Sequence, residues 1–109
     1  MAYAYKVLGQ SAPSATTNTD VYTVGSGKQA IISTITVANR GAAPATYRIA
    51  IRTAGATLAN QHYIAYDVGV AASDSTALTL GITLTATDVV TVYASTANTS
   101  FNLFGSEIS

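Results

Sequence analysis

Residues 78–94 read LTLGITLTATDVVTVYA, two runs of alternating apolar and polar residues joined by the turn-forming segment TATD. Alternation with a period of two is typical of β-strands that bury one face. Thr79, Thr83 and Thr91 take outward positions, where Lys, Glu or Arg is more usual. Covering a Thr face with another protein costs less desolvation energy than covering a charged face. The residues predicted to face the core are Leu78, Leu80, Ile82, Leu84, Val90 and Val92, and Ile35 and Ile49 on earlier strands are expected to be buried with them.

The same period of two continues along the chain, broken at short intervals by Gly, Pro, Asn and Ser. The predicted strands cover residues 3–8, 21–24, 29–38, 46–53, 62–68, 76–84, 89–94 and 100–104. About eight short strands with turn-rich joints indicate an all-β, single-domain antiparallel β-sandwich, either a jelly roll or an immunoglobulin-like fold.

One domain is expected over residues 1–109, with an N-terminal strand or arm at 1–10, a linker at 11–19 and the main sandwich at 20–109. The linker, SAPSATTNT, is the one segment of low complexity. A terminal strand on a linker can pair with a neighbouring subunit. We therefore expect both chain ends to be held in place.

The segment YRIAIR at 47–52 separates a core face from an outer face, because its odd-numbered residues are all apolar. Arg48 and Arg52 share the outer face, where they could grip an acidic partner. The alternative is that they pair within the chain, with Asp67 or Asp88.

The segment NQHYIAYD at 60–67 combines aromatic and amide side chains, which suit carbohydrate. Tyr63 and Tyr66 are three residues apart, so a regular strand places them on opposite faces and gives no shared stacking platform. Tyr66 is expected in the core with Ile64 and Val68. Tyr63 and Asp67 are then expected to point outward.

Composition excludes several classes of partner. Lys and Arg total five, Asp and Glu total five, and charged residues make up only 9% of the chain. This balance argues against nucleic-acid binding and against a polybasic membrane anchor. No apolar run is long enough to span a bilayer, and the N-terminal sequence lacks the features of a signal peptide, so we expect synthesis in the cytoplasm. Surfaces with so little charge tend to associate.

Motifs that could support catalysis are incomplete. The chain has no Cys, which removes thiol catalysis and Cys-based zinc sites, and His62 is its one His. The segment GSGKQ at 25–29 resembles the end of a phosphate-binding loop, but Tyr22 and Gln29 stand where that motif needs Gly and Ser or Thr. We expect no enzymatic activity, cofactor or metal, and place His62 at a strand edge.

Four stretches carry a family resemblance: DVYTVGSGKQAIISTITVANRGAAPATYRIAIRT at 20–53, QHYIAYD at 61–67, LTLGITLTATDVVTVYAST at 78–96 and SFNLFGSEI at 100–108. They resemble small virion proteins of tailed bacteriophages, notably phages of marine bacteria and cyanobacteria. The similarity extends from about Tyr3 to Ile108. It implies a non-enzymatic structural part located in the virion, and it carries over no functional residue.

Two functions follow as expectations. In the first, the chain is a capsid decoration or cement protein that binds and reinforces the particle surface. The alternative is a tail, neck or fibre subunit that binds a host receptor or glycan. The expected partners are further copies of the chain, with a trimer as one candidate, and virion proteins such as the major capsid protein or tail proteins. The candidate interface residues are Tyr3, Tyr5, Arg48, Arg52, Tyr63, Thr79, Thr83 and Thr91.

Overall fold

Eight strands and two single-turn 3₁₀ helices make up residues 2–109, the part of the chain that the computed structural model describes. Met1, the first residue of the predicted arm, lies outside the described residues. The strands are β1 (Tyr3–Ser11), β2 (Thr19–Thr23), β3 (Gln29–Asn39), β4 (Ala45–Arg52), β5 (Tyr63–Val70), β6 (Ser75–Thr85), β7 (Val89–Ala94) and β8 (Thr99–Ile108), with the 3₁₀ turns η1 (Thr53–Gly55) and η2 (Asn60–His62) between β4 and β5. The prediction of an all-β sandwich of about eight strands is confirmed.

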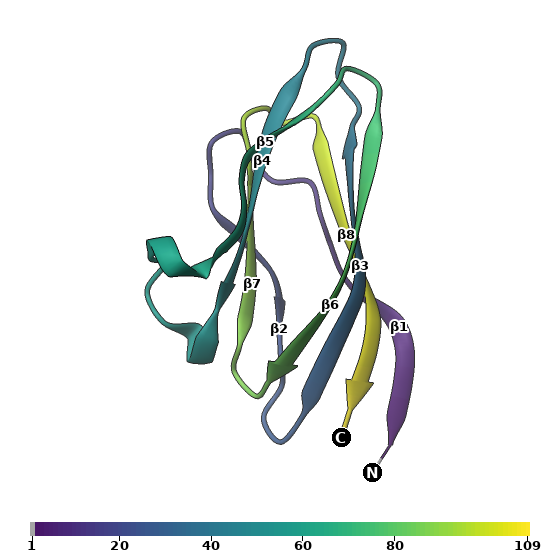
Figure 1. The fold of residues 1–109 in the computed structure, drawn as a ribbon, viewed down its shortest axis with the longest axis vertical. Coiled ribbons are helices and arrows are strands. Elements are labelled where there is room, and N and C mark those ends of the chain that lie inside the picture. The colour runs from purple at the N-terminus through teal and green to yellow at the C-terminus, as the bar shows by residue number, and fades with distance from the viewer. Residues whose placement is uncertain (1) are drawn as a thin grey trace.

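The strands form two four-stranded antiparallel sheets that pack face to face (Figure 1). One sheet has the order β1-β8-β3-β6 and the other β2-β7-β4-β5. The first strand thus pairs with the eighth, the second with the seventh, the third with the sixth and the fourth with the fifth. This nested pairing is the strand order of a jelly roll, so the sandwich is of that kind rather than immunoglobulin-like.

The core lies between the two sheets and is built from the inward residues that the period of two predicts. Ile35, Ile49 and Val92 are fully buried, as expected. At the centre the rings of Tyr47 and Phe101 meet edge to face, with their centroids 6.2 Å apart. Edge-to-face pairs of this kind stabilise a core beyond the apolar area that they bury.

Leu80 is the exception, since its predicted place in the core is wrong. The pairing of β3 with β6 shifts register between Ile32 and Thr34, so that Leu80 and Gly81 both lie opposite Ser33. Gly81 has a φ of 64°, a conformation that fits a β-bulge. The bulge sits on an edge strand of the sheet, and Leu80 there remains 49% exposed.

The assignment of Tyr66, Ile64 and Val68 to the core is also wrong, because β5 carries two irregularities, whereas Asp67 is exposed as predicted. The register of β5 against β4 shifts around Ile64 and again around Tyr66 and Asp67, which has a φ of 51°. The extra residue at Ile64 brings Tyr63 and Tyr66 to the same face, and the two rings meet edge to face at 4.9 Å. Tyr66, Ile64 and Val68 are exposed and not part of the core.

The two ends of the chain lie side by side at the same end of the sandwich (Figure 1). Ala2 and Ser109 exchange both of their main-chain hydrogen bonds, at 3.0 and 2.9 Å. The N-terminal strand therefore completes the chain's own sheet, as its edge strand beside β8. The 12–18 segment then crosses to the other sheet, held by a hydrogen bond from the Thr16 N–H to the Ala94 carbonyl. No helix within residues 2–109 is long and apolar enough to cross a bilayer.

Candidate functional site

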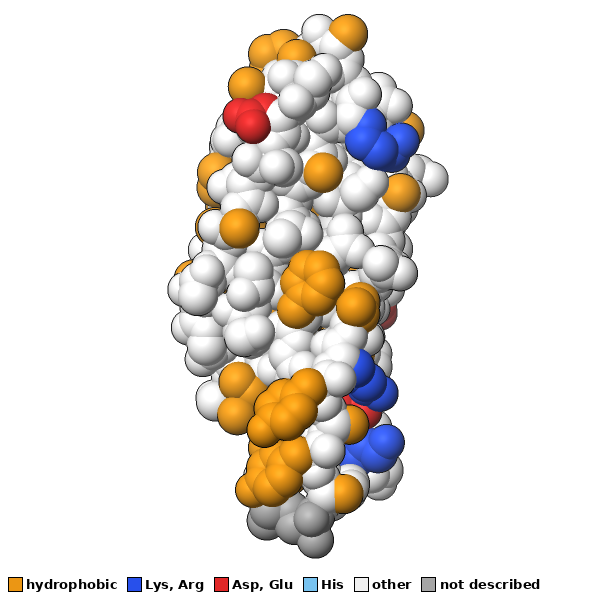
Figure 2. Space-filling view, turned by 90° about the vertical axis from the view of Figure 1, so that its right-hand side faces the viewer, with side chains coloured by type: hydrophobic (Ala, Val, Ile, Leu, Met, Phe, Trp, Pro, Cys, Tyr) orange, Lys and Arg blue, Asp and Glu red, His pale blue; other side chains and the backbone are white. Residues whose placement is uncertain are grey.

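An apolar strip runs along the β1 side of the outer face of the sheet β1-β8-β3-β6. Figure 2 views this face and shows large hydrophobic side chains gathered in its lower half, with charged side chains at its margins. Tyr5 is 85% exposed and Tyr3 is 60% exposed, while Val7 and Ile31 are exposed beside them. Together with Phe104, three of these residues line an open hollow of about 530 Å³. We call Tyr3, Tyr5, Val7, Ile31 and Phe104 the apolar strip.

The apolar strip lies next to the Thr-covered face that the sequence predicts, on the same side of the sheet. Strand register places Tyr5, Ser106, Ile31 and Thr83 in one row across the sheet. The next row runs from Val7 through Phe104 and Thr34 to Thr79. Thr79 and Thr83 are exposed on the β6 side, as expected. The outer face is thus apolar at one edge and hydroxyl-rich at the other.

The main chain of β1 is open along this same edge. In an antiparallel pair, residues alternate between those that exchange hydrogen bonds with the partner strand and those that do not. Because Ala2 and Ser109 exchange both bonds, the alternation assigns Ala4 and Lys6 to the bonded positions against β8. Tyr3, Tyr5 and Val7 then turn their N–H and C=O groups toward the free edge. Those three residues also carry the exposed apolar side chains.

Glu107 neutralises the one cation of the exposed half of β1. Its carboxylate lies 2.7 Å from the Lys6 ammonium and accepts a hydrogen bond of 2.7 Å from the Tyr22 hydroxyl. The hydrogen bond from Lys6, followed by that from Tyr22, lowers the pKa of Glu107 below its usual value. Burial raises the pKa of Tyr22, and Glu107 raises it further. Lys28 lies 3.9 Å from the same carboxylate, so the strip is bordered by an ion-pair cluster of two Lys and one Glu.

A second exposed cluster lies on the outer face of the other sheet, around Arg48. The guanidinium lies 4.2 Å from the ring centroids of both Tyr66 and Tyr93, in cation–π contact with each. It also binds the Asp67 carboxylate through two hydrogen bonds, of 2.6 and 3.3 Å, and this contact raises the pKa of Arg48. Of the two alternatives for Arg48, the structure therefore shows the pairing within the chain, with Asp67. Tyr63 joins this cluster because its ring packs edge to face on the ring of Tyr66.

Arg52 pairs within the chain too, but with Asp20 rather than with Asp67 or Asp88. Its guanidinium contacts both Asp20 oxygens at 3.0 Å and donates to the Thr91 hydroxyl at 3.0 Å. Thr91 in turn donates to Asp20 at 2.8 Å and is only 4% exposed. The expectation that Thr91 lies on an accessible surface is therefore wrong, because this network covers it. Asp88 instead accepts hydrogen bonds from the main chain of Ala54 and Thr85.

The remaining candidates are structural. His62 is buried in η2, just before β5, and not at a strand edge as predicted; its Nδ1 accepts a hydrogen bond of 3.0 Å from the Ala59 N–H. The residues that the structure describes contain no group of three or more His, Asp or Glu placed to hold a metal ion. The segment GSGKQ forms a tight loop that leads into β3, with a Lys28 N–H to Gly25 carbonyl hydrogen bond of 3.2 Å.

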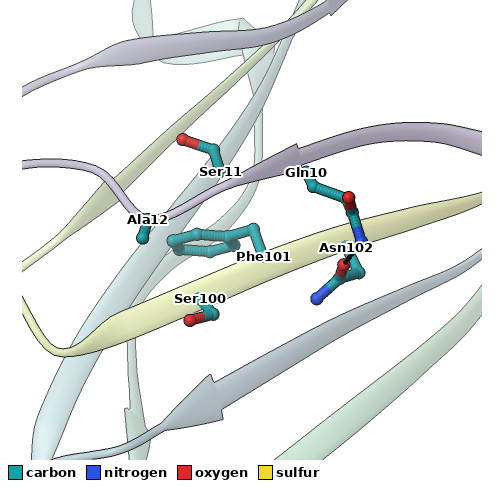
Figure 3. Close-up of a pocket in the computed structure, with 6 residues that line it drawn as sticks. All are labelled: Gln10, Ser11, Ala12, Ser100, Phe101 and Asn102. Atoms are coloured by element: carbon teal, nitrogen blue, oxygen red, sulfur yellow. Dashed lines mark hydrogen bonds between the residues drawn. The ribbon is translucent and has the colours of Figure 1, made fainter.

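A shallow hollow opens where β1 leaves β8 (Figure 3). Its amide groups satisfy each other, because Gln10 donates a hydrogen bond of 2.7 Å to Asn102. The hollow is lined by Gln10, Ser11, Ala12, Ser100, Phe101 and Asn102. These side chains carry no charge, so the hollow offers shape and little specific chemistry.

No protein-family model, curated protein or solved structure matches the chain. The roles of the apolar strip and of the Arg48 cluster are therefore argued from their geometry. The sequence predicts Tyr3 and Tyr5 of the apolar strip as interface residues and does not predict Val7, Ile31 or Phe104. A signal for Ile31 was present, since adjacent Ile31 and Ile32 in a strand must face opposite sides.

Proposed function

We propose that the chain is a non-enzymatic structural protein of a phage virion, in which it acts as a capsid decoration or cement protein that binds the particle surface. The observation that carries this proposal is the apolar strip beside the open edge of β1. Exposed apolar patches bordered by polar groups are typical of protein–protein contact sites. Such a surface acts by contact and requires no reactive group.

Two further features support the proposal. The sequence resembles small virion proteins of tailed phages, which supports the location in a particle. The jelly-roll strand order is one that viral capsid and lectin domains use, although a fold alone does not determine a function. The outward residues of the strands β1, β8, β3 and β6 carry no charge, and the Arg40 side chain lies at the margin on Ser100, so the centre of this face can be covered without stranding ions.

The direct test is quantitative mass spectrometry of phage particles purified from host cells in which the protein is made. A decoration protein should be present in copy numbers comparable to the major capsid protein. Absence from particles would overturn the proposal, and a copy number far below that of the capsid protein would favour the alternative location.

A matched pair of variants tests which face attaches. Tyr5→Ser removes the most exposed side chain of the apolar strip, and Tyr66→Ser removes an exposed Tyr from the opposite sheet. We expect Tyr5→Ser to be lost from particles and Tyr66→Ser to be retained. Equal retention of both variants would contradict attachment through the strip.

The alternative is a tail, neck or fibre subunit that binds a host receptor or glycan. One observation favours it: Tyr63, Tyr66 and Arg48 gather on one face, and aromatic and Arg side chains are enriched at recognition hot spots. In that case Tyr66→Ser particles should keep the protein but adsorb more slowly to host cells. Unchanged adsorption would exclude this role for the cluster.

A further inference from the structure

The four edge strands of the sandwich are not equally protected against pairing with another chain. Exposed strand edges invite pairing, and bulges are one of the devices that prevent it. β6 has its bulge at Gly81, and β5 has irregularities at Ile64 and Asp67. β2 is short and shifts register between Asp20 and Tyr22. β1 also shifts register, between Val7 and Gly9, and its stretch 3–7 runs in unbroken register, as does the stretch 75–79 of β6. Of these two stretches, the one on β1 carries large exposed apolar side chains, those of Tyr3, Tyr5 and Val7.

We propose that two copies of this chain pair through that stretch, antiparallel, with Tyr5 on the two-fold axis. The pairing rests on the proposed function, which it deepens by naming the partner of the β1 edge and the register of the contact. It joins the β1-β8-β3-β6 sheets of the two copies into one continuous sheet across the dimer.

The register follows from the direction of the main-chain groups. Tyr3, Tyr5 and Val7 turn their N–H and C=O groups to the free edge, so these residues must form the hydrogen-bonded pairs with the second copy. An antiparallel arrangement centred on Tyr5 sets Tyr3 opposite Val7 of the second copy and Tyr5 opposite Tyr5. Three pairs form, each exchanging two hydrogen bonds, and no free group of the stretch 3–7 is left over.

The side chains are compatible with this register on both faces. On the outer face, the exposed Tyr3, Tyr5 and Val7 of each copy meet those of the other, and aromatic cross-strand pairs stabilise sheets. On the other face, Lys6 lies opposite Ala4 of the second copy rather than opposite a second Lys. Each Lys6 has the Glu107 carboxylate 2.7 Å away as a counter-ion, although it shares this carboxylate with Lys28 at 3.9 Å.

The competing arrangement, in which β1 of one copy pairs with β6 of another, is less favourable. It is a head-to-tail contact, and such contacts build open chains unless the rotation closes. The bulge at Leu80 and Gly81 also interrupts the edge that β6 would offer. The symmetric β1 pairing meets neither obstacle.

Cysteine cross-linking tests the register, because the natural chain contains no Cys. Residues in a hydrogen-bonded pair have Cα atoms about 5.5 Å apart, which lies within the roughly 4.4–6.8 Å that a disulfide spans. Tyr5→Cys should therefore form a covalent dimer under mild oxidation. Tyr3→Cys alone should not, because its two copies lie about 14 Å apart. An equimolar mixture of Tyr3→Cys and Val7→Cys should cross-link.

Sedimentation velocity on the natural chain tests whether the dimer exists. We expect a dimer with a dissociation constant of roughly micromolar size. Tyr5→Lys places like charges directly opposite each other and should weaken the dimer by about tenfold or more. Thr79→Lys, which adds the same charge on β6 of the same face, is the matched control and should leave it unchanged.

Each result decides the proposal. A natural chain that stays monomeric up to about 500 µM overturns the pairing. A dimer that Thr79→Lys weakens and Tyr5→Lys spares, or one that cross-links through Tyr3→Cys alone, overturns the register. All of these measurements use purified protein, so they can fail while the protein is still found in particles, or succeed when it is not. The failure of this inference and that of the proposed function are thereby distinguishable.

Discussion

Truncating Ile35 and Leu80 should have very different costs, although the period of two assigns both residues to the core. Ile35 is fully buried between the sheets, whereas Leu80 is 49% exposed in the bulge of β6. The pair therefore tests the bulge directly. Both residues belong to paired strands of the same sheet, so they form a matched comparison.

The magnitudes follow from burial. Removing a fully buried Ile side chain to Ala costs about 2–5 kcal/mol, because the lost transfer energy adds to the energy of the cavity. Fully burying a Leu side chain contributes roughly 1.5–3 kcal/mol. Since Leu80 is about half exposed and its removal leaves no enclosed cavity, we expect Leu80→Ala to cost only about 1 kcal/mol. A change of 1 kcal/mol shifts the Tm of a domain of this size by about 4–8 °C.

The assay is denaturant and thermal unfolding followed by circular dichroism, at one protein concentration for all variants, because the chain has no Trp to report by fluorescence. Ile35→Ala should lower the Tm by roughly 10–20 °C, and Leu80→Ala by roughly 5 °C. Equal losses of 3 kcal/mol or so in the two variants would mean that Leu80 is a core residue and that the bulge is misplaced. Gly81→Ala is the companion variant: its new Cβ meets no atom within 4 Å, so its cost should be the roughly 1–2 kcal/mol of a left-handed Ala.

Three further variants probe the network, the sheet and the ion pair. Thr91→Val should lower the unfolding free energy by about 1–3 kcal/mol, measured by urea titration, because it removes the two hydrogen bonds that the buried Thr91 hydroxyl makes to the charged groups of Arg52 and Asp20; no loss would show that these hydrogen bonds contribute nothing to stability. Gly105→Ala should cost about 3 kcal/mol or more, or prevent folding, because a Cβ there would overlap the Ile31 carbonyl oxygen on β3; a normal Tm would contradict the close approach of β8 to β3. The lowered pKa of Glu107 means that its contribution to stability is complete above the ordinary Glu pKa of about 4.3 and is lost as the pH falls through the lower folded value. The unfolding free energy should therefore fall with acid in that range, and Glu107→Gln should fall less steeply.

The sequence predicts the strands and the sandwich because the period of two is a local property. Of the nine inward positions predicted on β4, β6 and β7, eight lie in or against the core, and Leu80 is the exception. Which of the two β-sandwich types forms could not be predicted, because strand order depends on pairings between distant segments. The contact between β1 and β8, at opposite ends of the chain, is the clearest example.

The wrong face assignments on β5 and β6 share one physical cause. A bulge adds a residue to one strand only, and a residue within the bulge, or beyond it as on β5, then departs from the regular alternation. Ile64 is such a residue, and it is why Tyr63 and Tyr66 meet although three positions separate them. The bulge on β6 has a signal in the sequence, because an isolated Gly within a strand pattern, here Gly81, often marks a bulge. Asp67, which adopts the same left-handed region, gives almost none.

The candidate surfaces were partly predictable for the same reason. Tyr3 and Tyr5 lie before any irregularity of β1, so their exposure follows from a regular strand at a sheet edge. Arg52 and Thr91 were predicted to point outward, and both side chains do lie on the outer side of their sheet. They are paired there with Asp20, which belongs to a strand far away in the sequence. A pattern within one strand carries no information about such a neighbour.

The Thr-covered face and the open β1 edge are two parts of one surface. Across the sheet β1-β8-β3-β6, the outward side chains change from Tyr and Val on β1, through Phe104, to Thr79 and Thr83 on β6. If two copies pair along β1, the two apolar strips join at the centre and the Thr positions form the margins on both sides. An apolar centre with a polar, uncharged border is the usual anatomy of a protein–protein interface. The paired face would then be suited to lie flat against a third surface, which explains why its outward positions carry Thr in place of Lys or Glu: hydroxyls tolerate being covered, whereas charges would oppose it.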